Sequence, residues 1–298
     1  MSFSREVKNE LAEHVDKARH CQLAELAAII SHEARVCVRD GETRLEFQSD
    51  NPLTQKKYFT LLAKTTTIDS NELDLGQADA KEVLTTVKMW KGQNADQPLC
   101  MDVVDGLLLQ QTCCKRAYIR GAFLAAGSIS DPNKSYHFEI VCRTQEQGEQ
   151  LQQVMMDFGV DAKIVERKKH YVVYLKEGAQ IVDMLNVMGA HVALMNLENV
   201  RILKEMRNSV NRKVNCETAN ISKTVNAAVR QVEDIQLIVE KQGMSSLPEN
   251  LQEIARVRME NPDMPLKELG ALLTPPIGKS GVNHRLRRIG EIADRLRV

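Results

Sequence analysis

The sequence has no long apolar run, few aromatic residues and no net charge. No apolar stretch in the 298 residues approaches the roughly 18–20 residues that a membrane-spanning helix needs. The first fourteen residues, MSFSREVKNELAEH, are charged from Arg5 onward and lack the apolar segment of a signal peptide. We therefore expect a cytoplasmic protein without membrane contact.

Sequence patterns of metal, redox and catalytic sites are also missing. The seven cysteines form no Cys-x-x-Cys pair, and the seven histidines show no metal-ligand spacing. Adjacent cysteines such as Cys113 and Cys114 rarely form a disulfide with each other, and a cytosol keeps thiols reduced. We expect plain thiols, no metal and no other cofactor. Without a His-Glu-x-x-His, Gly-x-Ser-x-Gly or dinucleotide-binding motif, no catalytic residue and no small-molecule substrate is predicted.

Charge is distributed unevenly along the chain. The 40 basic and 40 acidic residues cancel, so the chain as a whole does not attract nucleic acid. However, residues 201–230 hold seven cations and two acids, and residues 279–288 hold four cations and no acid. A phosphate backbone responds to such local clusters more than to the overall sum. These two basic segments are therefore candidate nucleic-acid contacts.

The carboxyl-terminal residues 247–298 predict three helices, the last two separated by a turn. Residues 265–273 form a short helix with one apolar face, made of Leu266, Leu269, Leu272 and Leu273. Two prolines between 274 and 278 end that helix. Helical spacing resumes at 279–297, with a buried stripe of Val282, Leu286, Ile289, Ile292 and Leu296. A helix–turn–helix with a basic second helix fits the DNA major groove.

The start of that second helix supplies the candidate contacts to double-stranded DNA. Asn to adenine and Arg to guanine are favoured bidentate pairings, so the candidates for base edges are Lys279, Ser280, Asn283, His284 and Arg287. Arg285 and Arg288 are candidates for phosphate contacts. The alternative is a solvated basic face on an ordinary core helix.

The Asn-rich segment 201–235 leaves two interpretations open. Its cations Arg207, Arg212 and Lys213 are candidates for phosphate contacts, or the segment is a solvated linker that caps the first domain. Because five asparagines weaken helix propensity, we expect a break and then a new helix from Ser222 to Gly243.

The first two hundred residues contain an internal repeat. Its clearest copy predicts a helix, a hairpin, a helix, a hairpin and a helix, at 115–127, 128–142, 144–159, 161–176 and 177–189. A shift of 93 residues reproduces the first three elements, at 22–34, 35–49 (turning at Asp40-Gly41) and 51–64. The second hairpin of this copy, near 65–75, and the helix after it are degenerate. The repeat predicts two similar lobes packed about a pseudo-twofold axis.

Three stretches closely resemble the WhiA proteins of Gram-positive bacteria, namely AYIRGAFLAAGSISDPNKSYHFEI (117–140), RNSVNRKVNCETANISKTVNAAVRQVEDI (207–235) and KSGVNHRLRRIGEIA (279–293). The resemblance implies an α+β fold, with a duplicated LAGLIDADG homing-endonuclease-like domain of two αββαββα lobes and then an all-α helix–turn–helix domain. It also implies a nucleoid-associated regulator of transcription in the cell cycle, cell division, chromosome segregation and, where the organism sporulates, sporulation.

The repeat and the three carboxyl-terminal helices, together with the resemblance, give the expected domain boundaries. We expect the LAGLIDADG-like domain at 1–205, with lobes at about 20–112 and 115–190. A basic Asn-rich linker and connecting helix follow at 206–246, and the helix–turn–helix domain occupies 247–298.

LAGLIDADG nucleases place an acid near the end of each of two motif helices, and the two carboxylates hold divalent metal for cleavage. Here the motifs align at 26–34 and 119–127, with Glu33 and Ala126 at the acid positions. Because alanine offers no oxygen, we expect no enzyme activity. The alternatives are a divergent metal-dependent DNA nuclease and a first domain that acts mainly as a protein-interaction scaffold, for example toward a sigma factor.

Overall fold

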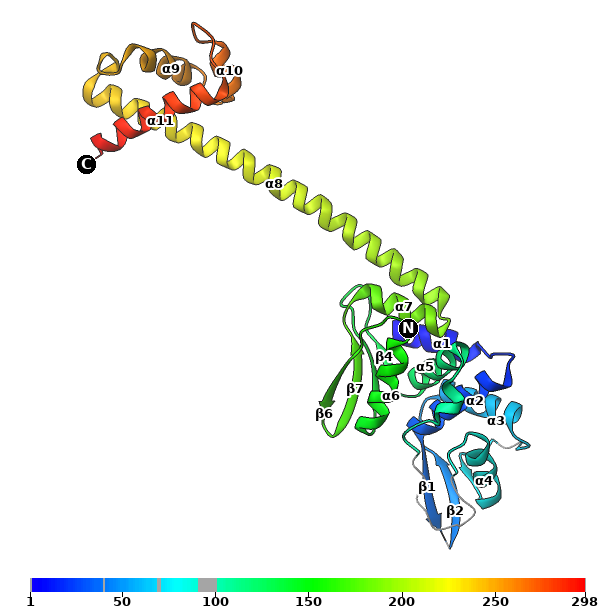
Figure 1. Cartoon of the computed structure of the whole chain (residues 1–298). Helices are drawn as coiled ribbons and strands as arrows, with labels where there is room; N and C mark the ends of the chain where they lie inside the picture. Colours follow the sequence, from blue (N-terminus) through cyan, green and yellow to red (C-terminus); the bar gives the residue numbers. More distant parts are fainter. Residues whose placement is uncertain (1, 40, 69–70, 91–100, 298) are drawn as a thin grey trace. The chain divides into compact units, whose positions relative to one another are not determined.

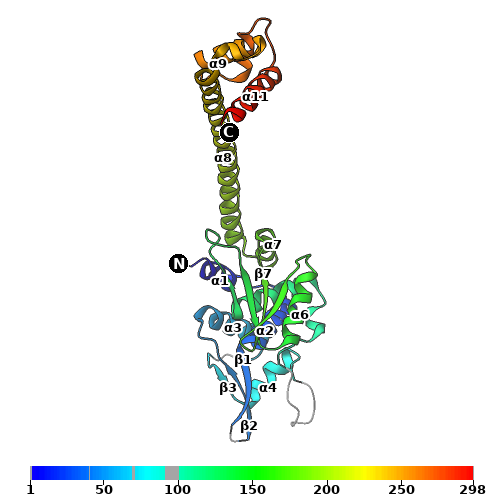
Figure 2. The same cartoon turned by 90° about the vertical axis from the view of Figure 1, so that its left-hand side faces the viewer.

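The computed structural model describes residues 2–39, 41–68, 71–90 and 101–297. The chain divides into two compact units, Met1–Glu205 and Met206–Val298, and each has its own hydrophobic core. Figures 1 and 2 show the chain from two sides. No helix among the described residues combines the length and the apolar character that a membrane crossing requires.

The first lobe of the first unit is helical with a small antiparallel sheet. Its elements are α1 (Phe3–Glu13), α2 (Arg19–Glu33), β1 (Ala34–Arg39), β2 (Glu42–Phe47), α3 (Pro52–Thr65), β3 (Asp74–Leu75) and α4 (Gln77–Thr86). The sheet has the order β1-β2-β3, and Val36 lies opposite Leu45. Gly41 has the positive φ that the predicted hairpin turn requires, while Asp40 lies outside the described residues. The degenerate second hairpin is represented, among the residues described, by the two-residue β3.

The second lobe repeats the plan more completely. It contains η1 (Gly106–Leu109), α5 (Thr112–Ala126), β4 (Gly127–Ile129), β5 (Phe138–Cys142), α6 (Gln145–Met156), β6 (Lys163–Arg167), β7 (His170–Leu175) and α7 (Gly178–Met188). Its antiparallel sheet has the order β4-β5-β7-β6. Thr144 caps α6 by accepting the Gln147 N–H, and Gly189 ends α7 at φ +87°. The expected elements of this lobe are confirmed.

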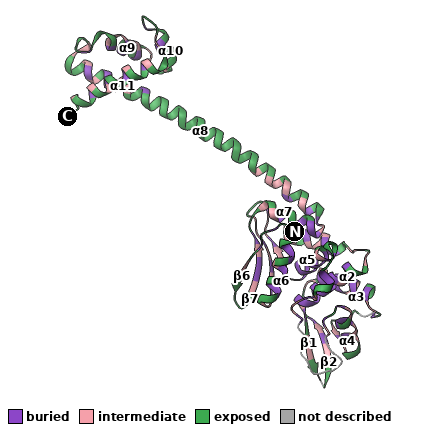
Figure 3. Cartoon of the chain, viewed as in Figure 1, coloured by how far each residue is buried: buried purple, intermediate pink, exposed green. Residues whose placement is uncertain are grey.

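Helices α2 and α5 pack against each other at the centre of the first unit, where both are almost wholly buried (Figure 3). A Cβ added to Gly121 of α5 would lie 2.5 Å from the Glu25 carbonyl oxygen of α2, so glycine permits the close approach. The same interface buries charge. Arg120 Nε and Lys57 Nζ each lie 3.0 Å from Glu25 Oε1, and all three side chains are nearly inaccessible.

The second unit is helical, and its longest helix corrects one expectation. Its elements are the later part of α8 (His191–Gln242), then η2 (Met244–Ser246), α9 (Glu249–Glu260), α10 (Leu266–Ala271) and α11 (Lys279–Leu296). The break expected before Ser222 was wrong, because α8 continues through it. Asparagine costs a helix only up to about 0.7 kcal/mol per residue, too little to interrupt it. The helix does stop before Gly243, which has φ +80°.

The core of the second unit lies between the end of α8 and the three following helices. Val282, Leu286 and Ile289 of α11 are buried as expected, but Ala293 replaces Ile292 and Leu296 as the next fully buried position. The predicted leucine face of α10 was wrong at Leu272, which is 53% exposed. Leu272 is the C-cap residue of α10, and the next residue, Leu273, is buried in the core instead.

Candidate nucleic-acid interface

The turn between α10 and α11 is held by a close approach of two backbone segments. The Ile277 N–H donates to the Gly270 carbonyl at 3.0 Å. A Cβ on Gly270 would lie only 2.2 Å from the Ile277 carbonyl oxygen, so this position requires glycine or a shifted turn. Buried Leu269 and Leu273 anchor the segment in the core. The first turn of α11 is therefore fixed against α10.

Helix α11 begins at Lys279 without a side-chain cap. The N-cap residue is Gly278, which has extended backbone and no side-chain acceptor. The first N–H groups of a helix lack intrahelical partners and carry partial positive charge. Because no side chain satisfies them here, they remain available to an anion such as a DNA phosphate.

The sequence-predicted residues of α11 divide into an exposed set and one half-buried member. The exposed set is Lys279, Ser280, Asn283, His284, Arg287 and Arg288. Arg285 is half-buried, and its Nη1 donates to the Asn250 carbonyl of α9 at 3.3 Å. Arg287 Nε lies 3.3 Å from Glu291 Oε1, with the two side chains 78% and 54% exposed. Such exposed pairs contribute about 0–1 kcal/mol, so an incoming acceptor can replace Glu291.

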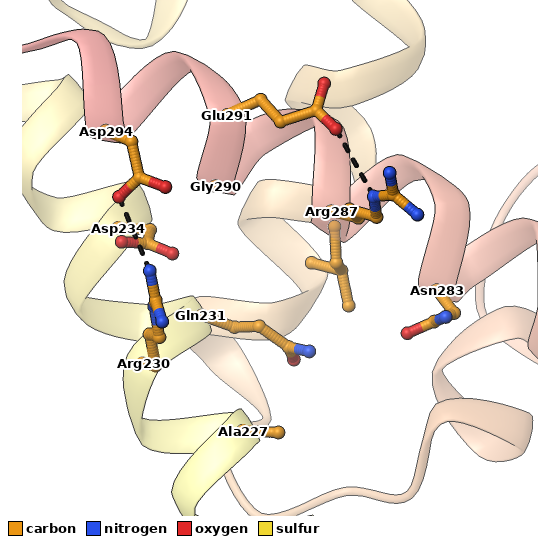
Figure 4. A pocket seen from close by; sticks show the side chains of 10 residues that line it. Ala227, Arg230, Gln231, Asp234, Asn283, Arg287, Gly290, Glu291 and Asp294 are labelled. Carbon is orange, nitrogen blue, oxygen red and sulfur yellow. Dashed lines mark hydrogen bonds and ion pairs between the residues drawn. The ribbon is translucent and has the colours of Figure 1, made fainter.

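A hollow of about 410 Å³ separates α8 from α11 within the second unit. Figure 4 shows Arg230 and Gln231 of α8 on one wall and Asn283 and Arg287 of α11 on the other. Arg230 is paired there with Asp294 at 3.4 Å. The hollow thus places a cation of α8, Arg230, near two candidate base-reading residues of α11.

A neighbouring hollow of about 550 Å³ brings Lys223 of α8 and Lys267 of α10 beside Lys279 and Asn283. His284, Arg287 and Arg288 line a third hollow on α11 together with Glu291. Sequence reasoning missed Lys223, Arg230 and Lys267. Lys223 and Arg230 lie far from α11 along the chain and Lys267 lies on the preceding helix α10, and only the packing of the helices places all three at the edges of α11.

The three predicted cations of the Asn-rich segment are exposed on α8 but do not share a face. At about 100° per residue, Arg212 and Lys213 lie roughly 140° and 240° around the helix from Arg207. At about 1.5 Å per residue, Arg212 also precedes Arg230 by roughly 27 Å along the axis. The structure therefore brings neither the three together nor any of them beside α11.

The ends of the two motif helices, α2 and α5, are the positions where a LAGLIDADG nuclease would hold its two metal-binding acids. Helix α2 ends at Glu33 and α5 ends at Ala126, so each aligned acid position is the last residue of its helix. Burial raises the pKa of Glu33 above its ordinary value, against the opposing charges of Arg143 and Lys8. Next to it, buried His32 has its pKa lowered to about 4, chiefly by burial. Of the two aligned acid positions, only Glu33 carries a carboxylate, and burial disfavours its charged form.

These features together define a class: a helix–turn–helix protein with a LAGLIDADG-like domain. The sequence model of the WhiA LAGLIDADG-like domain matches residues 115–207, and that of the WhiA C-terminal HTH domain matches residues 210–293. A "Probable cell division protein WhiA" from Lachnoclostridium phytofermentans is 52% identical, with both chains covered in full. The chain belongs to the WhiA family.

Another relative and a solved structure support the same family assignment and fold. A protein of the same name from Lachnospira eligens is 49% identical over 100% of this chain and 98% of its own. The crystal structure of full-length DUF199/WhiA from Thermatoga maritima covers 99% of each chain with a TM-score of 0.57 and 24% sequence identity. This structural likeness confirms the fold that the sequence resemblance implied.

Proposed function

We propose that this protein binds duplex DNA sequence-specifically through its helix–turn–helix and regulates transcription. The name of its relatives supports a role in cell division, to which we add chromosome segregation and, where the organism sporulates, sporulation. A DNA-bound regulator of this kind would reside on the nucleoid in the cytoplasm.

The observation that carries the proposal is the exposed face of α11. Six polar or cationic side chains project from a helix whose start is fixed by the Gly270–Ile277 contact. A recognition helix needs both features, because contacts to bases require exposed side chains that can reach the base edges and a helix backbone that is held in place.

We assign different tasks to these side chains. Asn283 and Arg287, which line the same hollow, are the base readers, since amide and guanidinium groups match the edges of adenine and guanine. Lys279, Arg288 and the free N–H groups of the first turn contact phosphates, together with the neighbouring Lys223 and Arg230. Arg285 has one N–H group engaged with Asn250 and contacts phosphate from the remaining ones.

We also propose that the first unit does not cut DNA. Metal-assisted cleavage requires anionic ligands from both motif helices, and Ala126 supplies none. The unit is net acidic in sequence, which favours a surface for protein partners, such as a sigma factor, over broad DNA contact. Incubating plasmid with the full chain and magnesium or manganese tests this, and cleavage that depends on Glu33 would refute it.

The base-reading role is tested by Arg287→Ala. We expect relaxed preference at one position of a selected DNA site and a loss of about 1–3 kcal/mol in binding free energy. The matched control is Arg256→Ala, an exposed arginine of α9 outside the candidate face. If the variant selects the same sequences as the wild type, Arg287 is not a reader.

The phosphate role of the α8 segment is tested separately by Arg212→Ala. We expect weaker binding to all sequences alike, and a slope of log affinity against log salt that is shallower by about 1. An unchanged slope would remove Arg212 from the interface and leave this part of α8 without a role in DNA binding.

A further inference from the structure

Four side chains with metal-binding atoms meet at the beginnings of α2 and α5. They are His20, Cys21, Cys113 and Cys114, and their ligand atoms all lie within 4.8 Å of one another. His20 Nδ1 is 3.2 Å from Cys114 Sγ, 3.3 Å from Cys21 Sγ and 4.0 Å from Cys113 Sγ. The imidazole nitrogen thus faces three sulfur atoms at once.

The four residues are two equivalent pairs. His20 and Cys21 are the second and third residues of α2, and Cys113 and Cys114 are the second and third residues of α5. The offset between the pairs is the same 93 residues that relates the two copies of the repeat. Zinc-finger spacing rules do not describe ligands supplied by two duplicated helices, so the sequence patterns gave no indication of this cluster. The repeat offset was the usable clue.

We propose that these four residues form a binding site for one zinc ion that joins the two motif helices. Zinc favours four tetrahedral ligands of cysteine sulfur and histidine nitrogen at about 2.3 and 2.0–2.1 Å. A tetrahedron with these bond lengths has sulfur–sulfur edges of about 3.8 Å and nitrogen–sulfur edges of about 3.6 Å. The three nitrogen–sulfur distances lie on both sides of that value, so small rotations about the side-chain bonds complete the geometry.

The donor set determines the class of metal. Three soft thiolates with one imidazole select zinc over magnesium or calcium, which prefer oxygen ligands. Four protein ligands leave no open position for water or substrate, as in structural zinc sites. Binding replaces the S–H protons of three thiols, which pass to solvent, by three metal–sulfur bonds, with no change of oxidation state.

The surroundings favour occupation by a cation. The ligand atoms lie within 4.8 Å of one another, so three thiolates gathered there repel one another and a cation between them relieves the repulsion. Neither α2 nor α5 has a side-chain cap, and their N-terminal dipoles stabilise the net negative charge of a zinc ion with three thiolates. His20 and Cys113 are exposed, whereas Cys21 and Cys114 are buried, so the metal reaches the site from solvent.

The experiment uses the full chain, purified under reducing conditions and analysed for metal content. We expect about one zinc per chain. Replacement by Co²⁺ should give the sulfur-to-cobalt charge-transfer band and the visible absorption of a tetrahedral site. Removing zinc with a chelator should lower the midpoint of thermal unfolding, because a ligand bound only to the folded state stabilises it.

Two variants of exposed ligands avoid disturbing the core. In Cys113→Ser we expect the charge-transfer band to fall to about two-thirds, since two of three thiolates remain, and zinc to be lost to weaker chelators. His20→Ala should keep the sulfur band and change the visible absorption. The matched control is Cys216→Ser, an exposed cysteine of α8 in the other unit, which should change neither spectrum nor zinc content. Circular dichroism of each variant verifies folding.

Three results would overturn the proposal. One is a wild-type chain that holds no more zinc than Cys113→Ser, and another is a Co²⁺ spectrum without a sulfur band. The third is a disulfide joining Cys21 to Cys113 or Cys114 that persists under reducing conditions in the presence of zinc, because that bond would make the cluster a crosslink of another kind.

Discussion

The two motif helices of the first unit have the same length, but they carry equivalent side chains only at their beginnings and different ones at their ends. Helices α2 and α5 each span 15 residues and are related by the repeat offset. At their beginnings both present a pair of metal-binding side chains. At their ends α2 carries His32 and Glu33, whereas the equivalent positions of α5 are Ala125 and Ala126.

The middle parts of α2 and α5 also carry different side chains. Glu25 of α2 faces both Arg120 of α5 and Lys57 of α3, and Asp16 supplies the second carboxylate that balances the two cations. A duplicated pair can thus keep its packing while the side chains at its middle and at its end diverge. Close packing depends on small residues such as Gly121, whereas a metal site depends on the identity of every ligand, so one substitution weakens or removes it.

The largest effect is expected at the buried charges. Glu25→Gln leaves Arg120 and Lys57 buried without their shared carboxylate, and breaking such a pair costs about 3–5 kcal/mol. Asp16, which also pairs with Arg120, compensates in part. Urea unfolding followed by fluorescence of Trp90, the chain's one tryptophan, reports on the first unit. Glu146→Gln, an exposed acid of α6, should change stability by less than about 0.5 kcal/mol. Equal effects of both variants would contradict the central role of Glu25.

The next largest effect is a dependence of stability on pH, which comes from His32 of α2 and has no counterpart at the equivalent Ala125 of α5. His32 has a pKa of about 4 in the folded chain against about 6.5 unfolded. As pH falls, the unfolded state takes up the proton first, so stability is complete above about pH 6.5 and is lost toward pH 4, by about 3 kcal/mol.

Urea unfolding at several pH values measures this loss. His32→Gln should flatten the dependence between pH 6.5 and 4, while His170→Gln, an exposed histidine of β7, should not. A wild-type profile that survives in His32→Gln would show that other groups carry the pH dependence.

A smaller effect tests the close approach of the two helices. In Gly121→Ala the new Cβ meets the Glu25 carbonyl and Ala28 Cβ at 2.5 and 2.9 Å, so the helices must separate, at a cost of about 1–3 kcal/mol. Gly148→Ala in α6 is the control, because its nearest neighbours lie at 3.6 Å or more. That variant should be neutral or gain up to about 1 kcal/mol in helix propensity. A stabilised Gly121→Ala would mean that the interface is looser than the structure shows.

The smallest effect is expected from restoring the missing acid. Ala126→Glu places a second carboxylate at the end of α5, opposite the end of α2 that carries Glu33. We expect weak Mn²⁺ binding, on the order of millimolar affinity, measurable by electron paramagnetic resonance and absent from the wild type. Adding Glu33→Gln should abolish it. Binding that persists in the double variant would locate the ion elsewhere.

The sequence alone determined the elements whose signals are local. Helical spacing and turn residues predicted α6 with its Thr144 cap, the hairpin of β6 and β7, and the two helices on either side of the 274–278 turn. Local signals also misled: asparagines in α8 predicted a break that a cooperative helix does not show, and Leu272 fell outside the core once α10 had ended.

Tertiary structure alone decided which distant residues meet. Lys223 and Arg230 border α11 only because the helices pack together. The 93-residue repeat offset relates His20 and Cys21 to Cys113 and Cys114, but only the packing of α2 against α5 brings their ligand atoms within reach of one another. Backbone preferences act over a few residues, so a sequence reveals them directly. A binding site depends on side chains from separate elements, and their proximity follows only from how those elements pack.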